Sequence, residues 1–210
     1  MRFDRLDLLP WLAMATERPE RRHPDFLPEA LDLRPWAGVL SEVAAAALLG
    51  SDLGFPIVYR GAALHFPREL TWKASYPARL EGGWFIGTFH AHGKGGAPSF
   101  DPQDLAATLR SDNPGFLDLL AVGGEVLALV RSNPFLYISA HHVTRNPMLL
   151  AEPHAELVAR HAPTSAPAAV RRAAFERATQ YFLERYQLAL YRGDPGEPLP
   201  RVHTPPGRWT

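Results

Sequence analysis

Two histidines one residue apart are the first side chains in this 210-residue chain whose spacing points to chemistry. His90 and His92 end the segment 82–92 (GGWFIGTFHAH), whose bulky apolar residues and bounding glycines predict a buried strand. Side chains at i and i+2 of a strand point to the same face of the sheet. We therefore expect the two imidazoles to lie side by side.

An acidic helix start follows the histidines after a glycine-rich loop. Asp101 stands at the expected N-cap, Pro102 at the first helical position and Asp104 at the third. This arrangement predicts a helix that begins at residue 102 and runs to about residue 110, because acids at the N-cap and proline at the first position both favour helix initiation. Asp104 is then expected at a fixed place beside the histidine strand.

Two neutral imidazoles and one carboxylate form the three-ligand set of a catalytic zinc site, which leaves the fourth position to water. Zinc lowers the pKa of such a water toward neutrality, so that it can attack a carbonyl. We therefore expect His90, His92 and Asp104 to bind Zn²⁺. In a purely structural alternative, Asp101 and Asp104 only cap the helix and complement its dipole.

Composition limits the other functions. With 46% hydrophobic and 21% charged residues, the chain is long enough for one globular core. The formal net charge is zero, so we expect no binding to nucleic acid or to an anionic membrane. The absence of cysteine excludes disulfides, thiolate metal sites and thiol nucleophiles, so a metal must be bound by His, Asp or Glu.

The sequence has no apolar run of the roughly 20 residues that a membrane-spanning helix needs. We expect a cytoplasmic protein. A short apolar stretch over 8–15 faintly resembles a secretory signal, but Asp4, Asp7 and Pro10 disfavour it, and secretion is the less favoured alternative.

The pattern of apolar residues predicts an α/β fold of the α+β type, in which helices flank a central mixed sheet in a single domain. An N-terminal helix and a charged loop are expected over 1–35, the domain over 36–192 and a proline-rich tail over 193–210. Within these limits the expected elements are helices over 1–15 and 36–49, a hairpin over 55–61 and 62–66, two strands over 115–132 around Gly123-Gly124, and a further strand over 135–142.

Apolar residues recur at helical spacing over 168–191, with arginines and glutamates between them. This pattern predicts a long C-terminal amphipathic helix. It either packs on the sheet of its own domain or binds a protein partner.

The histidine pair and the helix start together resemble a known signature. His90-Ala91-His92, followed by 100–105 (FDPQDL), is similar to the His-x-His … Ser-x-x-Asp motif of the JAB1/MPN/Mov34 (JAMM) metalloprotease superfamily, in particular its bacterial branches. The order of expected elements is also similar over 36–140. The resemblance implies a JAB/MPN-like fold, His90, His92 and Asp104 as zinc ligands, and hydrolysis of peptide or isopeptide bonds in a protein or peptide substrate.

Two positions depart from this family pattern. Asp101 stands where the family has a serine that helps to stabilise the oxyanion, and an ionised carboxylate cannot donate a hydrogen bond. Ser99 is a nearby substitute at a different spacing. Asp52 stands where the family has its glutamate general base. Three glutamates are alternative bases: Glu42, Glu69 and Glu81.

Three functions remain open from the sequence. The first is a JAMM-type zinc hydrolase, and the second is a degraded relative that acts as a binding or scaffold module. The third is an amidohydrolase or PHP phosphoesterase, but these barrels typically need about 250 residues. Of the remaining candidate residues, at most one of His141 and His142 can face the site, and Lys94 is placed to contact a substrate carboxylate.

Overall fold

A computed structural model describes most of the chain. The described residues are 29–50, 53–61, 63–70, 76–77, 79–109, 117–131, 146 and 148–203. The helix expected over 1–15 and the strand expected over 135–142 lie outside them. The elements are, in chain order, β1 (Ala30–Leu31), η3 (Arg34–Trp36), α2 (Ala37–Leu48), β2 (Gly54–Arg60), β3 (Ala63–His65), β4 (Arg79–Leu80), β5 (Gly83–Ala91), α3 (Pro102–Thr108), β6 (Leu117–Val122), β7 (Glu125–Arg131), α5 (Met148–His161), α6 (Ala168–Arg185), β8 (Leu188–Gly193) and β9 (Leu199–His203).

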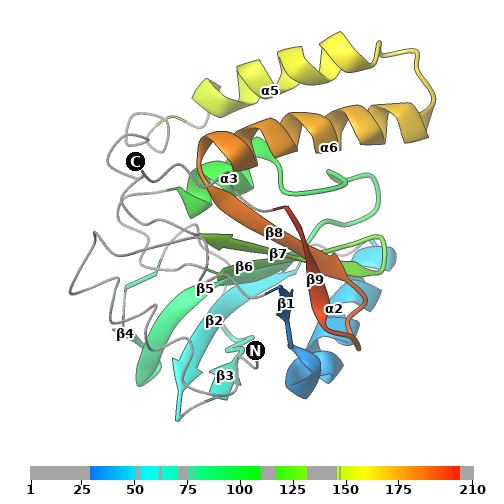
Figure 1. The fold of residues 1–210 in the computed structure, drawn as a ribbon. Helices are drawn as coiled ribbons and strands as arrows, with labels where there is room; N and C mark the ends of the chain where they lie inside the picture. Colours follow the sequence, from blue (N-terminus) through cyan, green and yellow to red (C-terminus); the bar gives the residue numbers. More distant parts are fainter. Residues whose placement is uncertain are drawn as a thin grey trace.

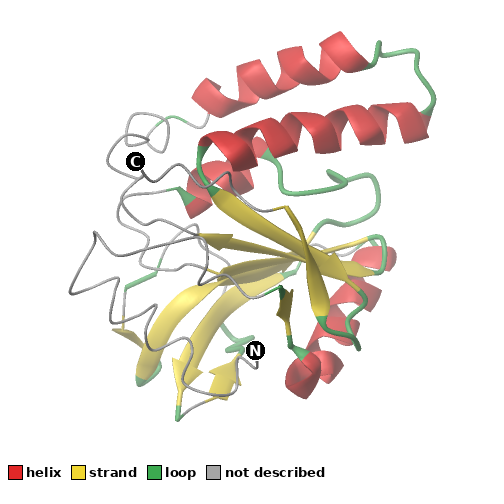
Figure 2. Ribbon diagram, in the orientation of Figure 1, coloured by secondary structure: helices red, strands yellow, loops and turns green. Residues whose placement is uncertain are grey.

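The described strands form one curled mixed sheet (Figure 2). Eight of them lie in the order β1-β9-β8-β7-β6-β5-β2-β3, and β4 pairs with β5 beside this path. β5 and β6 run parallel, while the other pairs are antiparallel. The mixed sheet flanked by helices confirms the predicted α/β class.

Helices cover both faces of this sheet (Figure 1). α2 packs on one face, and α3, α5 and α6 lie on the other. Residues of β6 alternate between two apolar clusters: Leu119 faces α2, whereas Leu120 packs with Leu105 of α3 and Phe182 of α6. The strand is therefore buried on both sides, as its largely apolar sequence predicts.

Several local signals act as predicted. α2 ends at Leu48, and Gly50, just after the C-cap, has a φ of 83°, the left-handed conformation that commonly stops a helix. Gly123 and Gly124 both have positive φ and form the two-residue turn between β6 and β7. The hairpin of β2 and β3 is also present.

The helix predicted over 168–191 ends earlier than expected. α6 stops at Arg185, and residues 188–193 form β8 in the middle of the sheet. Gln187 makes the turn with a φ of 51°. Because this position is usually occupied by glycine, the end of the helix has no visible sequence signal. The prediction of a helix that continues to residue 191 was wrong.

The predicted boundaries at the two ends were also wrong in part. Residues 199–203, assigned to an extended tail, form β9, and residues 30–31, assigned to a loop, form β1. Both strands are held by pairing with each other, and β9 also pairs with β8. Such pairing joins residues far apart in the sequence, so no local sequence pattern predicts it. α5, which contains Pro153, was not predicted either.

Gly87 allows β5 and β6 to approach closely. A Cβ atom built on this residue would lie 1.5 Å from the carbonyl oxygen of Leu117, and its φ is 158°. The neighbouring register of β5 with β2 shifts between Ile57 and Val58. A side chain at position 87 would therefore force the two parallel strands apart just before His90.

We expect Gly87→Ala to be severely destabilising, by more than about 4 kcal/mol, because the clash is with backbone that cannot rotate away. Gly38→Ala is the matched control, since nothing lies within 4 Å of its added Cβ in α2. It should be neutral or stabilise the protein by up to about 1 kcal/mol. Urea unfolding of both variants measures the difference, and equal stabilities would contradict the close approach.

Candidate metal centre

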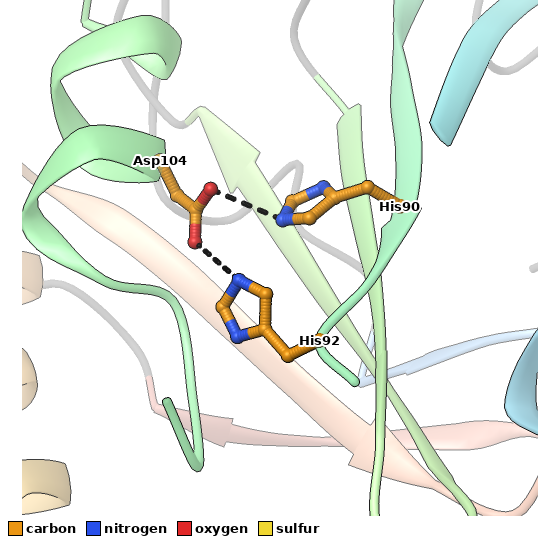
Figure 3. Close-up of side chains that lie close together, drawn as sticks. All are labelled: His90, His92 and Asp104. Carbon is orange, nitrogen blue, oxygen red and sulfur yellow. Dashed lines mark ion pairs between the residues drawn. The ribbon is translucent and has the colours of Figure 1, made fainter. Parts of the chain in front are cut away.

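Three side chains converge at the C-terminal end of β5: His90 of β5, His92 just after it, and Asp104 of α3 (Figure 3). Nε2 of His90 lies 3.1 Å from Oδ1 of Asp104, and Nε2 of His92 lies 3.2 Å from Oδ2. The ligand atoms of the three residues all lie within 4.8 Å of one another. Within the described residues, no other group of histidine and acidic side chains converges in this way.

Asp104 is held in place by the start of α3. Oδ1 of Asp101 accepts hydrogen bonds from the backbone N–H groups of Gln103 and Asp104, at 2.7 and 2.9 Å. In return, the Asp101 backbone N–H donates to Oδ2 of Asp104 at 2.9 Å. This reciprocal capping box confirms the predicted helix start. It also fixes the rotamer of the carboxylate that faces the histidines.

His92 is oriented by a second hydrogen bond. Its Nδ1 lies 3.0 Å from the carbonyl oxygen of Ala97. Because a carbonyl only accepts, Nδ1 must carry a proton. Nε2, which faces Asp104, then donates to the carboxylate when it is protonated and can bind a metal when it is not. Metal-binding histidines commonly have this arrangement, in which the second ring nitrogen donates to a carbonyl.

The charges of the cluster are coupled. Burial alone raises the pKa of the Asp104 carboxyl, but the charge of His90 and the hydrogen bonds from both imidazoles outweigh burial and hold that pKa well below its usual range. Burial lowers the pKa of His92, but the hydrogen bond and charge of Asp104 outweigh this effect and raise it. Burial and the charge of Asp104 raise the pKa of Asp101.

These residues fit a divalent metal ion. The side chains of His90, His92 and Asp104 are only 11, 14 and 10% exposed, so that the ligands are desolvated but can still be reached. A metal ion bound by Nε2 of His92 would take the place of the proton that this atom carries when the imidazole is charged. Two imidazoles and one carboxylate could hold such an ion with a coordination position left open.

The structure places Asp101 beside this cluster and Ser99 in the lining of another pocket. The Asp101 side chain caps α3. Ser99 is buried and lines a different pocket of about 360 Å³, together with Leu183 of α6 and His203 of β9. The proposed use of the Ser99 hydroxyl as a substitute oxyanion donor thus has no support from its position.

The three alternative glutamate bases lie elsewhere. Glu81 forms the turn before β5, at the end of the strand opposite His90. Glu69 lines a pocket together with Glu81. Glu42 is on α2, exposed, and pairs with Arg68. None of them faces the three ligands.

Asp52 lies outside the described residues, as do His141 and His142. Its neighbour in the sequence, Leu53, accepts a hydrogen bond from the N–H of Ala91 at 2.8 Å. Gly54 then pairs with His90 in the sheet. The chain therefore enters β2 directly beside the histidine strand. Lys94 is exposed, and its Cβ would lie 3.4 Å from a Cβ added to Gly50, which follows α2.

One buried acid near the site was missed by the sequence reasoning. Asp118 of β6 accepts hydrogen bonds from Thr88 of β5 and Thr108 of α3. No sequence signal identifies it, because its partners are 30 and 10 residues away and neither spacing forms a motif.

Comparisons with known proteins identify no family for this chain. No protein-family model, curated protein or solved structure matches the chain. None of the helices in the described part of the chain is long and apolar enough to cross a membrane.

The coupled charges predict how the stability of metal-free protein depends on pH. The pKa of His92 is raised, so its stabilising contribution is complete below about pH 6.5 and is lost as the pH rises through its folded pKa. The pKa of Asp104 is lowered, so its contribution is present above about pH 4 and is lost in acid. Chelator-treated protein should therefore lose unfolding free energy as the pH rises above about 6.5.

The fall of the unfolding free energy with rising pH should be smaller in His92→Gln, because glutamine cannot titrate. His161→Gln, which removes an exposed histidine at the end of α5, is the matched control and should keep it. Urea unfolding at several pH values measures the effect. An identical slope in wild type and His92→Gln would contradict the assigned charges.

Proposed function

We propose that the chain is a zinc-dependent hydrolase of peptide or isopeptide bonds, of the JAMM type. The observation that carries this proposal is the convergence of His90, His92 and Asp104, with ligand atoms within 4.8 Å of one another at the start of a capped helix. The histidine spacing and the helix start are the two parts of the sequence that resemble the family.

The protein residues have separate roles in this proposal. His90, His92 and Asp104 hold the zinc, and the capping box keeps Asp104 in position. When bound, zinc activates a water molecule at neutral pH and polarises the scissile carbonyl. Asp52 is the proposed general base, which accepts a proton from the attacking water at a carboxylate oxygen. The entry of the chain into β2 beside His90 supports this choice.

Asp101 is a residue of the proposed site that does not match the family pattern. It occupies the position of the family's serine, but its carboxylate is acceptor-only when ionised and would repel an oxyanion. Asp101 is also the N-cap of α3, a task that serine performs equally well. The same position can therefore be changed without removing the cap.

A scaffold role through the helix predicted over 168–191 is the second candidate. The apolar face of α6, which includes Ala178 and Phe182, is buried in its own domain. A partner would have to bind the exposed part of the helix, which includes Val170 and Tyr181. The metal-ligand cluster favours the hydrolase.

Metal content tests the centre directly. Protein purified without chelator should contain about one zinc per chain, and His92→Ala should abolish it, because loss of one of three protein ligands leaves too little coordination. His161→Ala, at the exposed end of α5, is the control and should retain the metal. Elemental analysis gives the stoichiometry. Equal metal in the two variants would refute the ligand assignment.

Hydrolysis tests the roles of the two acids. Asp52→Asn should remove cleavage of a peptide or isopeptide library while zinc is retained, because the amide cannot accept the proton. Asp101→Ser should raise the rate or create activity. One oxyanion donor is worth about 2.7 to 4 kcal/mol, so the gain is expected on the order of 100-fold. If wild type and Asp101→Ser both bind zinc but cleave nothing, the scaffold function replaces the enzyme.

A further inference from the structure

A buried carboxylate on β6 joins the two elements that carry the metal ligands. Asp118 is only 6% exposed. Its Oδ1 accepts hydrogen bonds from the backbone N–H of Thr88 at 3.0 Å and from the Thr88 hydroxyl at 2.7 Å. Its Oδ2 accepts from the Thr108 hydroxyl at 2.7 Å. One carboxylate oxygen of Asp118 is therefore hydrogen-bonded to β5 and the other to α3.

The two threonines that donate to Asp118 lie close in the sequence to the proposed metal ligands. Thr88 precedes His90 by two residues on β5, so both side chains point to the same face of the sheet. Thr108 follows Asp104 by four residues on α3, which places both on the same side of the helix. Asp118 thus connects the helix face that carries Asp104 to the strand face that carries His90.

Stability alone does not explain a carboxylate at this position. The same face of the sheet is covered by an apolar cluster that includes Leu105, Leu109 and Leu120. A buried charge is costly to desolvate, and well-packed apolar residues of similar volume are often equally or more stabilising. What the carboxylate adds is a directional connection between three elements, which an apolar side chain does not provide.

We propose that Asp118 is a positioning residue, which sets the distance between Asp104 and the histidine pair through Thr88 and Thr108. This inference rests on the proposed zinc centre. Its role resembles that of the outer-shell partners of metal ligands, whose loss typically lowers metal affinity about 10- to 100-fold. Here the connection acts on the elements that carry the ligands, and Asp118 itself does not touch the metal.

Thr108→Val isolates the connection to α3, because it keeps the volume of the side chain and both bonds between Asp118 and Thr88. We expect its zinc affinity to fall about 10- to 100-fold. Thr108→Ser keeps the hydroxyl and should restore wild-type affinity. Val43→Ala is the control for general destabilisation, since Val43 is buried on α2 against the other face of the sheet.

Zinc affinity is measured by competition with a chromophoric chelator, and the visible spectrum of the cobalt-loaded protein reports the ligand geometry. Thr108→Val should change this spectrum, while Thr108→Ser and Val43→Ala should not. If Thr108→Val does not fold, Thr88→Val replaces it, because it removes one hydroxyl bond and keeps the backbone bond. It should lower the affinity by a smaller factor.

The outcomes separate the two proposals. If wild type binds zinc and the valine variant of Thr108, or of Thr88 in its place, has the affinity and the cobalt spectrum of wild type, the positioning role of Asp118 is overturned and the zinc centre stands. An equal loss of affinity in Val43→Ala also overturns it, because general destabilisation then explains the effect. If wild type itself binds no zinc, the proposed centre fails, and the positioning role fails with it.

Discussion

The Asp104 carboxylate is the group on which the arrangement of this site depends. It is nearly buried, and a buried carboxylate is costly unless its oxygens find partners. Here one oxygen faces His90, and the other faces His92 and accepts the N–H of Asp101. The helix start, the loop after β5 and the strand that carries the histidines must all be placed correctly for these contacts to exist together.

The local features of the site could be predicted from the sequence because each has a short-range cause. The His-x-His spacing places two rings on one face of a strand, and the order Asp101-Pro102 with Asp104 encodes a capped helix. The expected strand over 82–92 and helix from residue 102 correspond closely to β5 and α3. The hypothesis that these two elements meet was based on the combination of the His-x-His pair with the acidic helix start, and the geometry confirms it.

The rest of the fold depends on contacts between distant residues. β9 is a strand because it pairs with β8 and β1, and its sequence, which contains Pro200, resembles a tail. The end of α6 depends on Gln187 in a conformation usually left to glycine. Asp118 reaches Thr88 because Gly87 lets β6 approach, and neither the approach nor the bond is visible in a linear pattern.

The cluster has different consequences for a scaffold and for a metalloenzyme. Without metal, the attraction between the Asp104 carboxylate and the His92 imidazole depends on a proton at Nε2 of His92. This attraction weakens as that proton is lost at higher pH. A domain that served only for packing would gain more from apolar side chains at these three positions. A metal ion replaces the proton with a charge that does not dissociate as the pH rises, and its affinity increases as the imidazoles become neutral. The same three side chains therefore contribute less to stability as the pH rises in a metal-free fold, and more in a metal-bound one.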